Sequence, residues 1–335
     1  MKFDGDYRYI ARGEKNNGIR GYITEDIQYL NEANTISFGQ DTATMFYQNE
    51  QYFTGDKIKV FRPKKHVKLN NNIAQLFIAA MQKSFSSFSW GSSSYSVSVL
   101  SAIKIQLPIK NGKINFSFME KFIAELEAER IAELEAYLIA TNLKDYTLTN
   151  KEQKVLDDFE KGKIEFDEFN LEKLFNKSTR GIRLKSADRV YGTLPFITAG
   201  ETNEGISAYI GNDVTVFSGN TTTIDMFGSA KYRNYKYGGD DHIAVVHTEN
   251  LSKFSSIFVT SAIHKSSHAG QFDYSRNFYA KDADKLNISL PTKNNLPNYK
   301  LMETFISAIQ KLVIKDVVLY ADKKINTTKR VINGR

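Results

Sequence analysis

The chain contains one long internal repeat, and its best-preserved part lies where each copy runs into a helical stretch. Residues 103–126 read IKIQLPIKNGKINFSFMEKFIAEL, and residues 286–309, which lie 183 positions further on, read LNISLPTKNNLPNYKLMETFISAI. A second match, between 9–19 (YIARGEKNNGI) and 196–206 (FITAGETNEGI), is displaced by 187 positions. Solenoid units run roughly 20–50 residues. The repeat therefore predicts two whole domains, each followed by a helix.

Composition narrows the class of protein. The 335 residues, 41% hydrophobic and 25% charged, are typical of a globular protein with room for two domains. No apolar run approaches the roughly 18 residues of a membrane span, and the N-terminus lacks the apolar core of a signal peptide. The absence of cysteine excludes disulfides and thiolate metal sites and favours a cytoplasmic location.

The net charge of +7 favours a polyanionic partner, although many enzymes share such a balance. The charge is unevenly distributed along the chain. Residues 173–189 and 231–236 are basic, whereas residues 119–135 are acidic on balance. The positive charge is therefore expected in the globular domains and not on the first long helix.

The first 112 residues alternate short apolar or β-branched runs with Asn, Gly and Asp, which is typical of strands and turns. Strands are predicted at 22–23, 35–38, 57–61 and 97–99, and apolar spacing predicts a helix at 72–83. Two longer helices are predicted at 117–142 and 299–324, where apolar residues recur every three or four positions without proline. At 1.5 Å per residue, each would be roughly 40 Å long.

An apolar stripe on a long helix needs a partner, and the other copy can supply it. We predict an α+β fold of two tandem globular domains joined by two long antiparallel helices, packed as a coiled-coil-like pair. The residues predicted to form this packing are Met119, Phe122, Leu126, Met302, Phe305 and Ile309. The acidic residues of the first helix are expected to face solvent or partner subunits; they are Glu125, Glu127, Glu129, Glu133 and Glu135.

The expected division is a first globular domain at 1–113, a first helix at 114–145, a connector with the second globular domain at 146–296, and a second helix with a tail at 297–335. The two copies are unequal. Residues 166–193 have no counterpart in the first half, because Gly5 already aligns with Gly192. We expect a first domain shortened at its start, with that segment either absent or supplied by another chain.

Two domains of mixed character, each followed by a long helix, resemble the specificity subunits of type I restriction–modification systems. Residues 169–175 (FNLEKLF) leading to 194–199 (LPFITA) look like the opening of a target-recognition domain. The Leu-Pro pair at 290–291, which leads into 298–306, looks like its close. The resemblance covers essentially the whole chain, and the shortened first domain departs from the family pattern.

The resemblance implies a recognition subunit without catalytic residues or cofactor, active in phage defence. Each globular domain would read one half of a bipartite DNA target, and the helix pair would space the readers on the scale of one duplex turn, about 34 Å. Methylation and cleavage would belong to a DNA methyltransferase and a restriction endonuclease/translocase, which use S-adenosylmethionine, ATP and Mg²⁺. Self-association through the shortened first domain is a further expectation.

Three groups of residues are candidates for DNA contact. Residues 231–236 (KYRNYK) interleave cations with aromatic residues, and arginine and asparagine can bind guanine and adenine edges; a solvent-facing edge strand is the alternative. A basic run at 180–189 is expected to contact phosphates. In the first domain, cations flank Gly13 and Gly18, whose counterparts Gly200 and Gly205 indicate tight turns. The candidates are Arg12, Lys15, Arg20, Arg180, Arg183, Lys185, Arg189, Lys231, Tyr232, Arg233, Asn234, Tyr235 and Lys236.

His264 and His268, followed by Asp273, have the i, i+4 spacing that a metal site can use. No glutamate follows the first histidine, as a metalloprotease requires. The other interpretations are a polar loop after the apolar 254–263 segment, or a loop that contacts DNA through His264, Lys265 and His268.

The sequence contains neither a glycine-rich phosphate-binding motif nor an Asn-Pro-Pro-Tyr methyltransferase motif. The acid-x-lysine triplets at 152–154 and 322–324 lie in the connector and near a helix end, so they are interpreted as surface charge. Three alternatives to a type I specificity subunit stay open. They are a tandem module that binds protein or glycan, the recognition part of a differently fused type II restriction–modification enzyme, and a nuclease with an unrecognised site.

Overall fold

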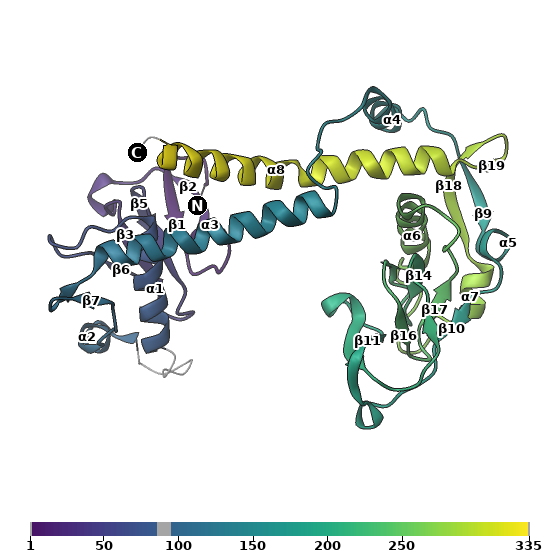
Figure 1. Ribbon diagram of the computed structural model, residues 1–335, viewed down its shortest axis with the longest axis horizontal. Helices are drawn as coiled ribbons and strands as arrows, with labels where there is room; N and C mark the ends of the chain where they lie inside the picture. The colour runs from purple at the N-terminus through teal and green to yellow at the C-terminus, as the bar shows by residue number, and fades with distance from the viewer. Residues whose placement is uncertain (1, 86–94, 334–335) are drawn as a thin grey trace. The chain divides into compact units, whose positions relative to one another are not determined.

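The computed structural model describes residues 2–85 and 95–333, with side chains up to residue 327. The chain divides into two compact units, Met1–Tyr137 with Ala321–Arg335 and Leu138–Tyr320. Each contains a globular domain and parts of the two long helices (Figure 1). The predicted α+β fold is confirmed. None of the described helices is both long and apolar enough to cross a membrane.

The second globular domain consists of two stacked β-sheets, with α6 (Lys253–Ser267) covering one of them. The covered sheet is antiparallel, in the order β10-β17-β14-β15 (Thr179–Arg180, Ala244–Val246, Thr221–Ile224, Ala230–Arg233). The other sheet has the order β12-β11-β16-β13 (Ile206–Ile210, Tyr191–Ile197, Tyr237–Gly239, Val216–Phe217). Within it, β11 and β16 run parallel.

Side chains of the covered sheet alternate between two cores. Val246 of β17 lies in the core beside α6 with Val259, whereas Val245 lies between the sheets with Ile197 and Tyr237. Successive residues of a strand face opposite sides. Because both faces of the sheet are covered, β14 and β17 are buried along their whole length.

A third sheet, β19-β18-β9 (Leu296–Pro297, Asn287–Lys293, Phe166–Asn170), leads into the last helix. The short helices α5 (Leu171–Phe175) and α7 (Ala280–Lys285) add to the core beside α6. The turns η4 (Ser186–Asp188) and η5 (Thr202–Gly205) flank β11. The connector also contains a helix that the sequence did not indicate, α4 (Asn150–Glu160).

The first globular domain repeats this arrangement with fewer strands. Its sheets have the orders β4-β3-β6 (Met45–Gln48, Thr35–Gly39, Ile58–Phe61) and β2-β1-β5 (Ile19–Ile23, Tyr7–Ile10, Tyr52–Thr54). The helix α1 (Asn71–Phe85) packs on the former. Short elements complete the domain: η1 (Asn16–Gly18), η2 (Ile27–Tyr29), α2 (Val97–Ala102), β7 (Ile109–Lys110) and β8 (Lys113–Ile114).

The predicted inequality of the two copies is visible in the strands. In the second domain, β9 pairs with β18 and β10 pairs with β17. In the first domain, residues 103–108 and β6 occupy the places of β18 and β17, and no strand of its described residues lies in the places of β9 and β10. In the first domain, β6 is therefore an edge strand, whereas its counterpart β17 pairs with β10.

Residues 97–99, predicted as a strand, form the start of α2 instead. Ser96 caps this helix by accepting a hydrogen bond from the N–H of Val99. A short apolar run is compatible with either structure, and here an N-cap serine decides for the helix. The predicted helix at 72–83 is confirmed by α1.

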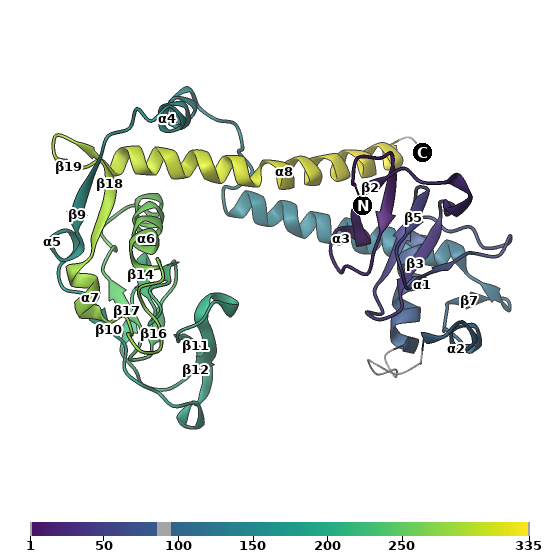
Figure 2. The same ribbon diagram turned by 180° about the vertical axis from the view of Figure 1, so that it is seen from behind.

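The two long helices are α3 (Phe116–Ala140) and α8 (Tyr299–Asn333). Within the first unit, the end of α8 lies beside α3 and runs antiparallel to it (Figure 1 and Figure 2). Lys324 of α8 forms an ion pair with Glu127 of α3. The predicted antiparallel pair is confirmed, but Glu127, predicted on an outward acidic face, faces the other helix.

The residues that pack these helices differ from those predicted. On α3, Phe122 and Leu126 are 44% and 40% exposed, whereas Met119, Ile131 and Leu138 are buried. The prediction is therefore wrong for Phe122 and Leu126. Apolar residues lie on several sides of α3, so the stripe could not be identified from spacing alone.

On α8, two of the predicted packing residues contact their own domain instead. Met302 is buried in the core beside α6. The ring centroid of Phe305 lies 4.7 Å from that of Phe159 on α4 and 5.9 Å from that of Phe258 on α6. The beginning of α8 thus belongs to the second domain, and packing by Ile309 stays a prediction.

Candidate nucleic-acid interface

Each domain contains an equivalent loop between two antiparallel strands, and the same backbone hydrogen bond closes it in both domains. We call residues 11–18, between β1 and β2, loop 1, and residues 198–205, between β11 and β12, loop 2. The N–H of Ala11 donates to the carbonyl oxygen of Gly18 at 2.9 Å, and that of Thr198 to the carbonyl oxygen of Gly205 at 2.9 Å. Gly18 and Gly205 have φ values of +75° and +80°. The tight turns predicted at these two glycines are confirmed.

Loop 1 lines a pocket of about 1150 Å³ in the first domain. Most of its wall comes from residues between Tyr9 and Arg20, and residues 41–42 and 55–56 complete it. The predicted DNA contacts Arg12, Lys15 and Arg20 all line this pocket. The structure therefore brings the three first-domain candidates together, and their contact with DNA stays a prediction.

The three cations differ in what they pair with. Arg12 forms an ion pair with Asp41, which also lies 3.2 Å from Nζ of Lys57. The hydrogen bond from Lys57, together with Arg12, lowers the pKa of Asp41 and keeps this carboxylate charged. Lys15 and Arg20 are exposed and pair with no acid in the described part of the chain. These two cations are therefore best placed to meet a phosphate.

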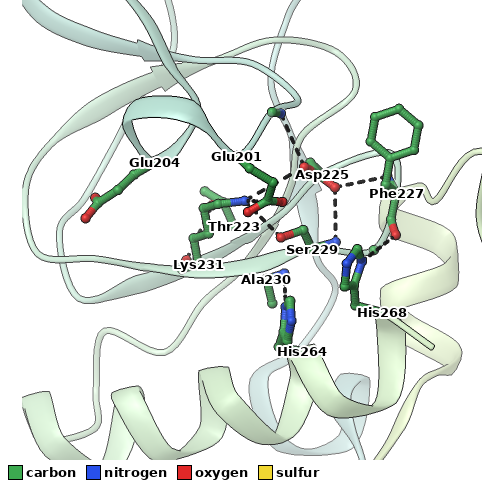
Figure 3. A network of polar contacts seen from close by, with 12 residues as sticks. Glu201, Glu204, Thr223, Asp225, Phe227, Ser229, Ala230, Lys231, His264 and His268 are labelled. Atoms are coloured by element: carbon green, nitrogen blue, oxygen red, sulfur yellow. Dashed lines mark hydrogen bonds and ion pairs between the residues drawn. The ribbon is translucent and has the colours of Figure 1, made fainter. Parts of the chain in front are cut away.

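In the second domain, two cations of β15 pair with acids of loop 2. Figure 3 shows Lys231 reaching toward Glu201. Residues 231 and 233 share one face of the strand because they are two positions apart. Nζ of Lys231 lies 3.1 Å from Oε1 of Glu201, and Nη1 of Arg233 lies 3.9 Å from Oε2 of Glu204. Both carboxylates belong to loop 2. The cations therefore hold a loop of their own domain.

This placement corrects the prediction of direct base contact by Arg233. Its side chain is 1% exposed and donates from Nε to the hydroxyl of Thr223 at 2.9 Å. Such a side chain cannot reach a base edge without leaving the core. Lys231 is 17% exposed and also donates to the Ser229 hydroxyl at 2.9 Å, so its charge is largely used inside the domain.

Asp225 organises the turn between β14 and β15. Its Oδ1 accepts hydrogen bonds from the N–H groups of Phe227 and Ser229, both at 3.0 Å. Its Oδ2 accepts from the N–H of Gly200 in loop 2 at 3.4 Å (Figure 3). The turn and loop 2 are therefore joined through one buried carboxylate.

The two histidines brace the same turn. His264 lies in the last turn of α6 and His268 is its C-cap, so residues 264–267 continue the helix and do not form the predicted loop. Nδ1 of His264 accepts from the N–H of Ala230 at 3.1 Å, and Nδ1 of His268 donates to the carbonyl oxygen of Phe227 at 3.0 Å. Burial lowers the pKa of His264, and His268 and Lys231 add to this effect.

Neither histidine belongs to a cluster that could hold a metal among the described residues. Such a cluster is formed instead by Asp240, Asp241 and His242, in the turn between β16 and β17, with ligand atoms within 4.8 Å of one another. The three residues are half-buried.

The other predicted contacts fall into two groups. Arg189 is engaged within the domain, because it donates to the carbonyl oxygen of Leu184 and the hydroxyl of Ser207 and lies over the Phe196 ring. Tyr232 donates to the Asn220 side chain, and Tyr235 accepts from Arg233. The exposed candidates, which stay predictions, are Arg180, Arg183, Lys185, Asn234, Lys236, Lys265 and His268.

Sequence reasoning missed Glu201 and Glu204, the acidic partners of the β15 cations. A signal was present, because the repeat aligns them with Glu14 and Asn17 in a loop of fixed length. The spacing of residues 231 and 233 could also have indicated one shared face of a strand. That this face lies under loop 2 depends on the fold.

Comparisons with known proteins agree with this two-domain arrangement. A family model described as the type I restriction modification DNA specificity domain matches residues 1–136 and again residues 163–319. The specificity subunit S.BcgI of the type II restriction enzyme BgcI from Heyndrickxia coagulans is 24% identical over 314 residues, which are 91% of this chain and 86% of that protein.

Among solved structures, the S subunit of a type I restriction–modification system from M. genitalium is similar with a TM-score of 0.62 and 17% identity. The match covers 100% of this chain and 88% of that chain. At this identity, the likeness shows a shared fold.

Proposed function

The chain belongs to the type I restriction modification DNA specificity family, and we propose that it reads a bipartite DNA target for a type I restriction–modification complex. The observation that carries this proposal is the family match in both halves of the chain, at residues 1–136 and 163–319. Its partners are double-stranded DNA and the modification and restriction subunits. The proposed readers are the globular domains at 1–113 and 146–296, held by the helices at 114–145 and 297–335.

The two loops support a division of labour between the domains. Loop 1 and loop 2 share their closing hydrogen bonds but differ in side chains, since Arg12 and Lys15 align with Ala199 and Thr202. On the strands that follow, Arg20 of β2 aligns with Ser207 of β12. A common frame with different side chains suits two half-sites of different sequence, because base edges are read by side-chain chemistry.

The primary test is methylation sequencing of a host with and without this chain. We expect a split motif whose methylation disappears when the chain is deleted. Purified complex should then bind that motif with an affinity that falls steeply between 50 and 200 mM salt, because counterions are released from the duplex. Weak binding that is independent of salt and motif would contradict the proposal.

We further propose that the chain itself is not catalytic and carries no cofactor. S-adenosylmethionine, ATP and Mg²⁺ would be used by the partner subunits, in the cytoplasm where the chromosomal DNA lies. Incubation of the purified chain with target DNA and Mg²⁺ tests this, and any cleavage that follows the protein through purification would overturn it.

A second candidate function is recognition for a type II enzyme in which modification and cleavage are organised differently. The 24% identity to the specificity subunit of a type II enzyme favours it. The two candidates differ in energy use. Cleavage by the reconstituted complex that requires ATP supports the type I assignment, whereas cleavage without ATP supports the type II assignment.

A further inference from the structure

Loop 2 contains a backbone conformation that its side chain disfavours. Glu204 has φ +55° and ψ +22°, in the left-handed region. The equivalent residue of loop 1 is Asn17, with φ +54° and ψ +28°. Asparagine is enriched in this region, but glutamate is not. A glutamate held there persists only where its surroundings fix it.

Loop 1 is held by a buried amide. Gln48, the last residue of β4, is 0% exposed. Its Nε2 donates to the carbonyl oxygen of Asn17 and to the hydroxyl of Ser37, both at 3.1 Å. Nδ2 of Asn17 donates back to Oε1 of Gln48 at 3.4 Å and to the carbonyl oxygen of Tyr47 at 3.1 Å. One side chain thus joins the loop to β3 and β4.

Loop 2 is held from the same place by a buried guanidinium. Arg233 is the last residue of β15, as Gln48 is of β4. Its Nε donates to Thr223, which aligns with Ser37. Its Nη1 donates to the hydroxyl of Tyr235 at 3.1 Å and lies 3.9 Å from Oε2 of Glu204, which aligns with Asn17.

The backbone confirms that the two positions are equivalent. The carbonyl oxygen of Gln48 accepts from the N–H of Asn34 at 2.7 Å, and that of Arg233 accepts from the N–H of Asn220 at 2.6 Å. Asn34 and Asn220 also share a left-handed conformation, with φ values of +60° and +63°.

We propose that Gln48 and Arg233 are positioning residues that lock loop 1 and loop 2 in one conformation, so that each lock supports recognition of one half-site. The neutral lock consists of Asn17, Ser37 and Gln48, and the charged lock of Glu204, Thr223 and Arg233. The effect on recognition rests on the proposed function. The existence of the locks is inferred from the contacts of Gln48 and Arg233 alone.

The two locks use equivalent positions with different chemistry: Gln48 forms hydrogen bonds to loop 1, whereas Arg233 forms an ion pair with loop 2. Arg233 without Glu204 would keep its hydrogen bonds to Thr223 and Tyr235, but it would lose its contact with loop 2. Glu204 without Arg233 would keep an unfavourable backbone conformation with no partner to fix it. Exchanging one member should therefore release the loop, whereas exchanging the whole trio should preserve it.

The first domain provides the sequence for a variant that should restore the lock. Arg233→Gln breaks the charged lock, and the triple variant E204N/T223S/R233Q rebuilds it as the neutral lock of the first domain. Glu204→Gln is a milder break, because Glu204 is 70% exposed and its loss leaves the core intact. Lys253→Gln removes an exposed cation of the same domain that belongs neither to the lock nor to the candidate DNA contacts, and it serves as the control.

The first readout is amide hydrogen exchange in the full chain with its partner subunits. In Arg233→Gln and Glu204→Gln, we expect exchange in residues 198–205 to accelerate about tenfold or more, because local opening becomes easier. The triple variant should return to within about threefold of the parent, and α6 should not change. If Arg233→Gln does not fold, Glu204→Gln carries the test.

The second readout is discrimination between the target and DNA altered in one half-site. Arg233→Gln should lose about tenfold in discrimination at one half-site, on the order of one lost base contact, and none at the other. The triple variant should recover it, and Lys253→Gln should leave half-site preference unchanged. A purely structural role would lower binding to all DNA equally.

The outcomes separate the two proposals. Unchanged exchange in loop 2 in both Arg233→Gln and Glu204→Gln would show that no lock exists. Accelerated exchange with unchanged discrimination would show that loop 2 does not position a reader. If the parent complex discriminates no target at all, the proposed function fails, and the exchange data still decide whether the locks exist.

Discussion

The ammonium group of Lys311 lies 3.1 Å from a carboxylate oxygen of Glu152, and this ion pair fastens α4 to α8. The two side chains are 14% and 7% exposed. Ser307 of α8 donates to the other oxygen of Glu152 at 2.6 Å, and Lys311 also donates to the carbonyl oxygen of Thr147 at 2.9 Å. The connector between the domains is thereby held against the last helix within the second unit.

Acid should loosen this attachment. Burial alone would raise the pKa of Glu152, but hydrogen bonds from Ser307, the Thr149 N–H and Lys311 outweigh it and lower the pKa to about 2. Because the pKa is lower in the folded protein, the carboxylate stabilises the fold above its unfolded pKa. This contribution, about 3 kcal/mol, is lost between about pH 5 and pH 2.

The measurement is the free energy of unfolding of the parent and Glu152→Gln across this pH range. Their difference should be largest above pH 5 and disappear near pH 2. Asp158→Asn is the control, because its ion pair with the 75%-exposed Lys154 lies on the surface and should contribute little to stability. A pH-independent difference for Glu152→Gln would contradict the prediction.

The equivalent glycines of the two loops should differ in their tolerance of alanine. Both need positive φ, which costs alanine about 1 kcal/mol or more. A Cβ at Gly205 would also lie 2.7 Å from the carbonyl oxygen of Thr198, whereas one at Gly18 would meet side-chain atoms at 3.2 Å. Thermal unfolding should show Gly205→Ala to be the more destabilising.

Gly13→Ala is the matched control for this pair. A Cβ there meets nothing within 4 Å, so the melting temperature should not change beyond the small effects usual for surface substitutions. Equal destabilisation by Gly18→Ala and Gly205→Ala would contradict the prediction, because it would mean that the backbone moves to relieve the clash at Gly205.

Two tyrosines make the same buried hydrogen bond in the two domains. The hydroxyl of Tyr52 lies 2.9 Å from that of Thr35, and the hydroxyl of Tyr237 lies 2.9 Å from that of Thr221. Each threonine donates to a backbone carbonyl, so each tyrosine must be the donor to its threonine. Burial raises the pKa of both tyrosines and keeps them protonated at neutral pH.

Tyr52→Phe and Tyr237→Phe should each lower the free energy of unfolding by about 1 kcal/mol, because each leaves a threonine oxygen without its donor. Chemical denaturation measures the loss. Tyr191→Phe, at a side chain that is 92% exposed, should have no effect. A loss in one domain and not in the other would mean that the two contacts are not equivalent.

The exposed cation Arg20 should contribute to DNA binding through charge. Arg20→Gln is expected to reduce the slope of log affinity against log salt by about 1, as expected for one lost phosphate contact, and to weaken all sequences equally. Lys151→Gln, which removes an exposed cation from α4, is the control. Relaxed preference at a single base would instead identify Arg20 as a base contact.

Features that depend on neighbours in the chain could be predicted well. The repeat predicted two domains with a long helix after each, and glycines at fixed spacing predicted the turns at Gly18 and Gly205. Such features need only local spacing and backbone preference. The same reasoning failed at Val97, where a short run compatible with strand or helix became a helix through its serine cap.

Features that depend on distant residues could not be predicted. Arg233 was predicted to contact DNA because of its neighbours in sequence. Its side chain is buried, however, and contacts Thr223 and Glu204. Phe122 looked like a packing residue, yet it stays exposed. In each case, burial depends on whether another helix or strand covers the side chain, and local spacing does not specify where that element lies.

Local sequence patterns thus specify the two copies, the long helices and the hydrogen bonds that close the two loops, because the same pattern forms the same hydrogen bonds in both copies. Which cations stay exposed and which ones pair within a domain depends on contacts between distant parts of the chain. A charged side chain is buried or exposed according to whether a partner lies across from it, and the fold alone brings Arg233 under Glu204 and Gln48 under Asn17.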